Sequence, residues 1–163
     1  MKLITLQSIY SGFQTGVDTG AIIAADLLGF RTGGFAPQGW MTETGPNEEW
    51  IKSMNGVECT KPGYLARTEM NVRTTDATVI ISHEPRLTGG SYETSRIAES
   101  LDKPWKQIRL KKDLVPIYVE GSLGLVEWLN MIECRRVNIA GPRESKCLGI
   151  EDRVCRWLMM ELG

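Results

Sequence analysis

Six residues near the middle of the chain, 77–82, limit the fold more than any other feature of the sequence. They read Ala-Thr-Val-Ile-Ile-Ser, an almost continuously apolar run that is rich in β-branched side chains. Such a run is typical of a central strand in a parallel sheet, where helices cover both faces of the strand. The segment therefore predicts an α/β fold built around one deeply buried strand.

The rest of the chain alternates short apolar runs with longer amphipathic stretches. Further strands are expected at residues 3–9, 30–35, 105–110, 115–119 and 136–140. Helices are expected to begin near residues 16, 62, 92, 122 and 149. This alternation implies a mostly parallel sheet with helices on both faces. A length of 163 residues fits one domain, 1–163, with an irregular excursion at about 36–61.

Hydroxyl residues stand at several of the predicted helix starts. Thr15 and Asp18 have the spacing of a capping box, in which the hydroxyl accepts from the Asp18 amide and the carboxylate reaches back. Ser91 and Ser122 are expected to cap the two helices that follow them. Gly29 is the expected end of the first helix.

Charge, histidine and cysteine content exclude several classes of function. The formal net charge is −1, and no basic stripe interleaved with aromatic residues argues for nucleic-acid binding. The lone His83 has no ligand-spaced partner, and the four cysteines form no Cys-x-x-Cys motif, so no side-chain metal site is expected. No apolar stretch approaches the ~20 residues that span a membrane. We therefore expect a cytoplasmic protein with free thiols and neither a nucleic-acid nor a membrane partner.

Three predicted strand-to-helix junctions, residues 11–18, 87–94 and 140–146, combine glycine with hydroxyl side chains. In a parallel sheet they would lie at the same carboxyl edge, where ligands of open α/β folds bind. Glycine lets a ligand oxygen approach the backbone, and the first amides of a helix favour an anion. Arg143 and Lys146 add positive charge. The sequence therefore predicts a cradle for a phosphate-bearing small molecule, although neither Walker A nor Gly-x-Gly-x-x-Gly spacing occurs.

Structural interpretations stand beside this one. A single glycine-rich turn is more often only a tight turn, and an exposed Arg143–Glu144 pair contributes ~0–1 kcal/mol. Trp40 is suited to stacking on a flat ring and equally to plugging the core beneath the excursion. His83 follows the central strand and is more simply a loop residue than a base. The convergence of three junctions at one edge favours the ligand site.

A further polar cluster lies at residues 67–76. Arg67, Asn71 and Thr74 share one helix face, and Glu69 and Arg73 have i, i+4 spacing. From the pattern alone, a solvated face with a Glu69–Arg73 ion pair is the favoured interpretation. Contact of Asn71 and Arg73 with a ligand is the alternative.

Four segments, in this order, resemble the putative molybdenum carrier family. They are residues 11–18 (Ser-Gly-Phe-Gln-Thr-Gly-Val-Asp), 71–76 (Asn-Val-Arg-Thr-Thr-Asp), 89–94 (Gly-Gly-Ser-Tyr-Glu-Thr) and 140–145 (Ala-Gly-Pro-Arg-Glu-Ser). The resemblance runs almost end to end. It implies a Rossmann-like three-layer fold, related to Lonely Guy-type and lysine decarboxylase-like proteins, and a nucleotide or the molybdenum cofactor as ligand. Any molybdenum would then arrive inside a pterin cofactor held by its phosphate.

The resemblance also implies which residues bind the ligand, and it brings Asn71 and Arg73 into that set. The expected ligand-binding residues are Ser11, Gly12, Gln14, Thr15, Gly16, Asp18, Asn71, Arg73, Gly89, Gly90, Ser91, Thr94, Gly141, Pro142, Arg143 and Ser145. A Rossmann-like domain with an apolar last helix often pairs with itself, so a homo-oligomer is expected.

The chain departs from its relatives in two places. Phe13 stands where Ser-Gly-Gly-Gln is expected, and a bulky side chain there would narrow the cradle or change the group it accepts. Residues 89–94 lack the proline and third glycine of the enzymatic Pro-Gly-Gly-x-Gly-Thr-x-x-Glu pattern, which favours a binding or carrier protein over an enzyme. A nucleotide-sensing module is not separated from that reading. The alternative is a nucleotide N-glycosidase or phosphoribohydrolase, with Glu93 or Glu144 acting on the ribose.

Overall fold

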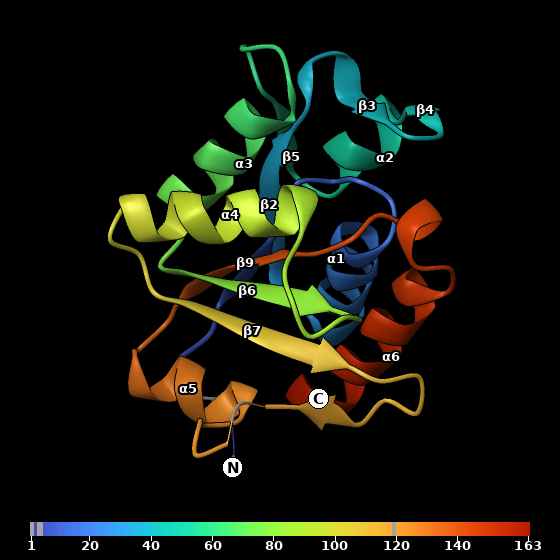
Figure 1. Ribbon diagram of the computed structural model, residues 1–163. Helices are drawn as coiled ribbons and strands as arrows, with labels where there is room; N and C mark the ends of the chain where they lie inside the picture. The colour runs from blue at the N-terminus through green and yellow to red at the C-terminus, as the bar shows by residue number, and fades with distance from the viewer. Residues whose placement is uncertain (1, 3–4, 119) are drawn as a thin grey trace.

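A seven-stranded sheet forms the centre of the computed structural model, which describes residues 2, 5–118 and 120–163 (Figure 1). Every neighbouring pair of strands is parallel except the last, where β7 and β8 run antiparallel. The strands, in spatial order, are β5 (Gly56–Glu58), β2 (Arg31–Ala36), β1 (Ser8–Tyr10), β9 (Arg136–Ala140), β6 (Ala77–Ser82), β7 (Trp105–Leu110) and β8 (Pro116–Ile117).

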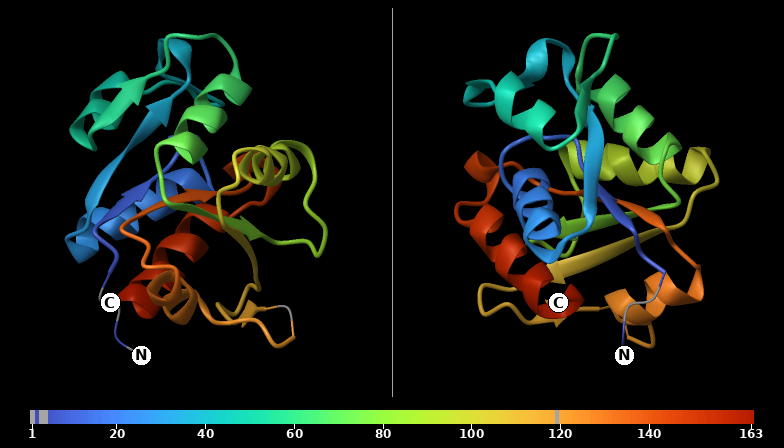
Figure 2. Two further views of the ribbon diagram at one scale, coloured as in Figure 1. Left: turned by 90° about the vertical axis from the view of Figure 1, so that its left-hand side faces the viewer. Right: turned by 180° about the vertical axis from the view of Figure 1, so that it is seen from behind.

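Helices lie on both sides of this sheet. The left view of Figure 2 shows α1 (Val17–Leu28) and α6 (Ile150–Leu162) on one side, with α3 (Tyr64–Arg73) and α4 (Gly89–Ser100) on the other. The short helix α5 (Leu125–Met131) packs near α6. This layering confirms the α/β, Rossmann-like arrangement with a mostly parallel central sheet.

The larger hydrophobic core lies between the sheet and the α1–α6 pair. Ile9, Val79, Ile139 and Trp157 are among its fully buried side chains. Every residue of β6 is buried, as its continuous apolar sequence predicts for a strand covered on both faces. β6 has β9 and β7 as its neighbours, so it does not lie at an edge of the sheet.

Element boundaries follow the sequence closely where periodicity is strong. Strands 105–110 and 136–140 occur as predicted, and Gly29 ends α1 in a left-handed conformation with φ 82°. The first strand is shorter than expected, Ser8–Tyr10, and Leu3 and Ile4 lie outside the described residues. The piece expected at 115–119 contains only the two-residue β8, and Val119 is likewise outside the described residues.

The predicted side-chain caps are wrong at three helices. Gly16, Thr88 and Gly124 occupy the N-cap positions of α1, α4 and α5, and no side chain caps those helices. Ser91 lies inside the first turn of α4 rather than before it. The capping box fails because Asp18 accepts the Gln14 amide at 3.1 Å and the Thr15 oxygen accepts the Glu144 amide at 3.2 Å.

The excursion after β2 is folded around a small core of its own. It contains the 3-10 turn Gln38–Trp40, the hairpin of β3 (Met41–Thr42) and β4 (Gly45–Pro46), and α2 (Glu48–Ser53). Phe13, Ile22, Ala36 and Ile51 form the core, and Trp40 packs against it. Trp40 therefore serves as a core plug beneath the excursion.

Within the described part of the chain, no helix is both long and apolar enough to cross a membrane.

Candidate functional site

A cleft of about 630 Å³ opens at the carboxyl ends of β1, β9 and β6, which are adjacent strands. The three glycine-containing junctions after these strands all contribute to its lining, and α3 supplies a fourth wall. The strand order therefore brings together segments that are more than 120 residues apart in the chain. The three junctions therefore lie together at one edge of the sheet, as the sequence predicts.

Two glycines allow the loops after β1 and β9 to interlock. A Cβ on Gly16, whose φ is 81°, would lie 2.4 Å from the Pro142 carbonyl oxygen. A Cβ on Gly141 would lie 2.6 Å from Val17 Cγ2, and also 2.6 Å from the carbonyl oxygen of Ile81 in β6. The Val17 amide donates to the Pro142 carbonyl at 3.1 Å across this contact. Gly16 and Gly141 thus set the shape of the cleft, and Gly16 does not itself line it.

The start of α4 forms an open part of the cleft. Gly89 and Gly90 line it, and a Cβ on either would meet no other atom within 4 Å. The first amides of a helix lack intrahelical partners and carry the positive end of the helix dipole. An anion that enters the cleft can approach this backbone without steric hindrance.

The α3 wall carries a buried ion pair. Arg67 Nη1 lies 3.2 Å from Asp18 Oδ2, and the two side chains are only 12% and 5% exposed. The guanidinium lies over the Tyr64 ring, 5.5 Å from its centroid, and directly against Gly12. Arg67 therefore enters the cleft as a cation that is largely removed from water.

Burial is the largest influence on the pKa of Asp18. The surrounding protein raises the pKa of its carboxyl group to about 6, although Arg67 and the Gln14 amide both favour the carboxylate. A desolvated carboxylate loses more hydration than these partners restore. Asp18 is therefore a cleft group that changes charge close to neutral pH.

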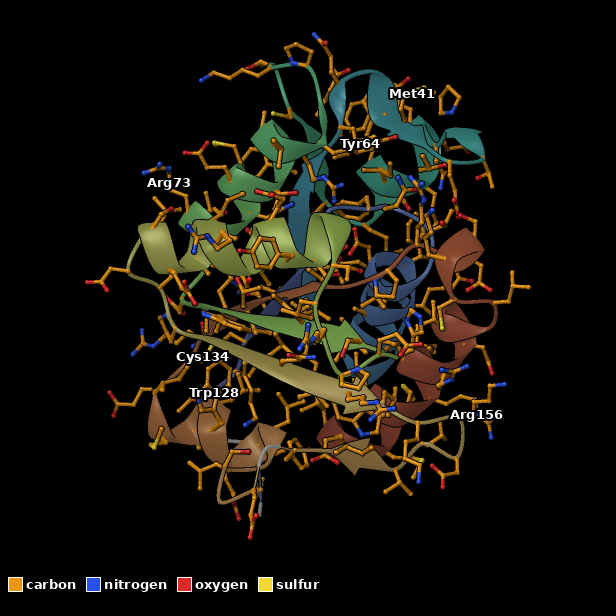
Figure 3. The ribbon with its side chains drawn as sticks, in the orientation of Figure 1. Met41, Tyr64, Arg73, Trp128, Cys134 and Arg156 are labelled. Carbon is orange, nitrogen blue, oxygen red and sulfur yellow. The ribbon has the colours of Figure 1, made fainter. Side chains whose placement is uncertain are left out.

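Asn71 lines the cleft, but both polar atoms of its side-chain amide are hydrogen-bonded to the backbone of β2. Its Nδ2 donates to the Phe35 carbonyl at 3.0 Å, and its Oδ1 accepts the Phe35 amide at 2.8 Å. Asn71 thereby fixes α3 to the end of β2. Arg73 does not reach the cleft: it is exposed and pairs with Glu69 at 2.8 Å. Figure 3 shows Arg73 at the opposite end of α3 from Tyr64.

Beside the cleft, the Glu43 carboxylate joins the loops after β1 and β9. It accepts the Thr15 hydroxyl, the Ser145 amide at 3.0 Å and the Ser145 hydroxyl at 2.5 Å. Arg143 Nε lies 3.4 Å from it. These donors lower the pKa of the Glu43 carboxyl group, with the Ser145 hydroxyl contributing most.

The structure divides the predicted ligand-binding residues into two groups. Those that line the cleft are Gly12, Gln14, Asp18, Asn71, Gly89, Gly90, Ser91, Thr94, Gly141, Pro142 and Arg143. Those that do not are Ser11, Thr15, Gly16, Arg73 and Ser145. Ser11 is fully buried and accepts the Phe13 amide, while Thr15 and Ser145 hold Glu43.

The two candidate catalytic glutamates also lie outside the cleft lining. Glu93 is exposed on α4. Glu144 accepts the amides of Gly149 at 2.5 Å and Glu151 at 3.0 Å, so its carboxylate organises the entry to α6.

Phe13 does not narrow the cradle, contrary to the expectation from its bulk. Its side chain is 1% exposed, packs in the small core and meets the Trp50 ring edge-to-face at 6.0 Å. Its φ of 59° is in the left-handed region, which glycine adopts more easily than other residues. Here the cost of the left-handed backbone, about 1 kcal/mol, is offset by burying an aromatic ring.

Several lining residues were missed as binding candidates. Arg67 had a signal, because it shares a helix face with Asn71, one turn away. Lys146 follows the glycine loop after β9, and its positive charge is the signal that the sequence offers for it. Tyr64, Arg86 and Asn138 carried no pattern that separates them from ordinary surface or strand residues, and their position in the cleft depends on the tertiary fold.

Comparisons with known proteins agree with this architecture. The model of the circularly permutated YpsA SLOG family matches residues 9–162. A crystal structure from Syntrophus aciditrophicus SB, described as a "putative molybdenum carrier protein", is similar with a TM-score of 0.83 and 33% identity, over 99% of this chain and 96% of that one. A search of curated proteins found no significant match. The fold, the cleft and the matched length together show that this chain belongs to the circularly permutated YpsA SLOG family.

Proposed function

We propose that the cleft binds a phosphate-bearing small molecule, a nucleotide or a pterin phosphate, and that the protein holds or carries this ligand. The observation that carries the proposal is the charge around the open start of α4. Arg67, Arg86, Arg143 and Lys146 line the same cleft as Gly89 and Gly90. Cations and free helix amides that converge on one cavity are a typical phosphate site.

The cleft also suits a ligand larger than a free anion. A cavity of about 630 Å³ lies in the range of small-molecule sites, roughly 300–1,000 Å³. Tyr64 and Leu65 line it and remain 46% and 58% exposed, and Leu87 lines it nearby. Exposed apolar and aromatic side chains beside a cationic pocket favour a ligand with a flat ring attached to its phosphate.

The name of the similar protein mentions molybdenum, and we propose that this chain would hold that metal only through the organic part of a cofactor. Among the described residues, no group of three His, Cys, Asp or Glu side chains lies together as a metal site. The cleft instead offers donors and cations suited to a phosphate. Molybdenum would therefore reach this protein inside a pterin cofactor, and the residues named above would hold the cofactor's phosphate.

The alternative of an N-glycosidase is less well supported. Such chemistry needs a carboxylate beside the sugar with water excluded. Glu93 and Glu144 lie outside the lining, which weighs against them in that role. Asp18 is the buried carboxyl group within the cleft, and Arg67 already pairs with it.

A substitution at Gly90 tests the proposal with little cost to the fold. Its Cβ position faces open space and its φ is not positive. The free energy of unfolding of Gly90→Leu should therefore lie within about 1 kcal/mol of that of the wild type, while the leucine side chain enters the cleft. We expect calorimetric titration with AMP, GMP and a phosphorylated pterin to show binding by the wild type and at least tenfold weaker binding by Gly90→Leu. The matched control is Gly124→Leu at the start of α5, where the nearest atom is 4.0 Å away and the cleft is not touched. Equal affinities in all three proteins would contradict the assignment of the site.

A further inference from the structure

We infer that Thr15, Arg143 and Ser145 form a second anion site, which Glu43 occupies in this structure and which an anionic group of the ligand takes when the segment around Glu43 lifts. We call residues 37–47 the strap. The inference adds regulation to the cleft and, in its link to the ligand, rests on the function proposed above. It begins from the chemistry around a single carboxylate.

The donors around Glu43 are those of an oxyanion site. Two hydroxyls, one backbone amide and one guanidinium surround its carboxylate, whose side chain is 17% exposed. The Thr15 oxygen also accepts the Glu144 amide at 3.2 Å, which leaves its proton to point at the carboxylate. Hydrogen bonds of this kind to a charged oxygen are about twice as strong as neutral ones.

These same donors were expected to bind a ligand phosphate. Thr15 and Ser145 follow the glycine loops after β1 and β9, and the sequence places them in the cradle. The structure shows that they do hold an anion, and that the anion is the chain's own Glu43. The carboxylate therefore acts as an internal stand-in for an external anionic group.

The strap is anchored at its start and held more lightly at its hairpin. Trp40 packs against the small core, and the Gly39 amide donates to the Glu58 carboxylate at 2.5 Å. The hairpin has only the pairs Met41–Pro46 and Thr42–Gly45, and the Glu43 amide donates to Gln14 Oε1 at 2.9 Å. A two-strand hairpin this short has little independent stability, so the Glu43 contacts hold this end of the strap in place.

Arg143 connects the strap to the cleft. Its Nε lies beside Glu43, it makes no hydrogen bond through that nitrogen, and the residue also lines the cleft. An anion in the cleft that attracts this guanidinium weakens its hold on Glu43. Binding in the cleft and release of the strap are thereby coupled through one shared side chain.

Removal of the carboxylate gives a test that needs no cleft ligand. We expect Glu43→Ala to lower the melting temperature by about 2 to 4 °C. Sodium acetate or inorganic phosphate at tens of millimolar should restore at least half of that loss with a saturating dose dependence, and sodium chloride at equal ionic strength should not. Glu43→Gln fills the same space with a neutral amide, so acetate should raise its melting temperature by no more than it raises that of the wild type. The double variant Glu43→Ala/Ser145→Ala should lose the rescue.

Absence of an anion-specific rescue, or an equal rescue of Glu43→Gln, would overturn the second anion site. Hydrogen exchange on the wild-type protein tests the coupling even if the variants fold poorly. Saturating AMP should speed the hydrogen exchange of the strap amides of residues 41–45 at least threefold and slow that of the amides of residues 89–91. If calorimetry shows AMP binding while strap exchange is unchanged or slower, the coupling is wrong and the proposed function stands. If acetate rescues Glu43→Ala but AMP does not bind, the anion site stands and AMP is not the cleft ligand.

Discussion

Replacement of Arg67 by methionine is expected to lower the free energy of unfolding at pH 7 by about 1–2 kcal/mol and to weaken ligand binding at least 100-fold. The first effect arises because Asp18, whose pKa is about 6, would lose its ionic partner and take up a proton, which costs about 1.4 kcal/mol at pH 7. The second arises because the cleft would lose its most desolvated cation. A charge-assisted hydrogen bond to a ligand contributes most to affinity where the cation is removed from water. Urea unfolding and calorimetry with AMP measure the two effects.

The family resemblance offers a matched control on the same helix. Arg73→Met removes an exposed i, i+4 pair with Glu69, whose side chains are 54% and 50% exposed, and should change stability by at most about 0.5 kcal/mol. Its ligand affinity should stay within threefold of the wild type. The double variant Arg67→Met/Asp18→Asn should recover much of the lost stability, because it removes the carboxyl group that must otherwise take up a proton. Equal losses for Arg67→Met and Arg73→Met would contradict this description of the cleft.

The pH dependence of stability should carry the signature of Asp18. Its folded pKa of about 6 exceeds an unfolded value near 3.9, so the folded state binds more protons between these values. The Asp18 contribution is therefore greatest below about pH 4, is lost as pH rises to about 6, and stays lost above it. Relative to Asp18→Asn, the free energy of unfolding of the wild type should fall by about 2 kcal/mol between pH 4 and pH 7.

Urea unfolding of both proteins across that range, at constant ionic strength, isolates the effect, because the other titrating groups cancel in the difference. The NMR chemical shift of the Asp18 carboxyl carbon, followed as a function of pH, gives the pKa directly. A difference that is flat with pH, or that grows in favour of the wild type as pH rises, would show that Arg67 outweighs burial and that Asp18 stays ionised throughout.

Much of the fold could be predicted from sequence because local patterns and global packing agree. The continuous apolar run at 77–82 needs helices on both faces, and it lies well inside the sheet. The strands 105–110 and 136–140 and the stop at Gly29 follow from equally local signals. The three glycine junctions meet because their strands are parallel and adjacent.

What could not be predicted depends on contacts between distant segments. Capping at Thr15 failed because the amide of Glu144, 129 residues later, donates to the Thr15 hydroxyl oxygen, and the hydroxyl proton is donated to Glu43. The Phe13 side chain was expected to point into the cradle, but it packs in the small core because the excursion supplies apolar partners for it. The resemblance selected Arg73, whereas helix geometry turns Arg67 toward the cleft and Arg73 toward Glu69. Such choices are made by tertiary structure and leave little trace in a local window.

If the cleft recognises the phosphate of a small molecule that also carries a ring, the phosphate must contribute much of the affinity. Calorimetric titration of the wild-type protein with AMP and with adenosine, at one fixed salt concentration, measures that contribution. We expect AMP to bind at least tenfold more tightly than adenosine, and we expect this preference to shrink as the salt concentration rises, because salt screens the attraction between charges. Absence of binding by AMP at millimolar concentration, or equal affinity for AMP and adenosine, would contradict it.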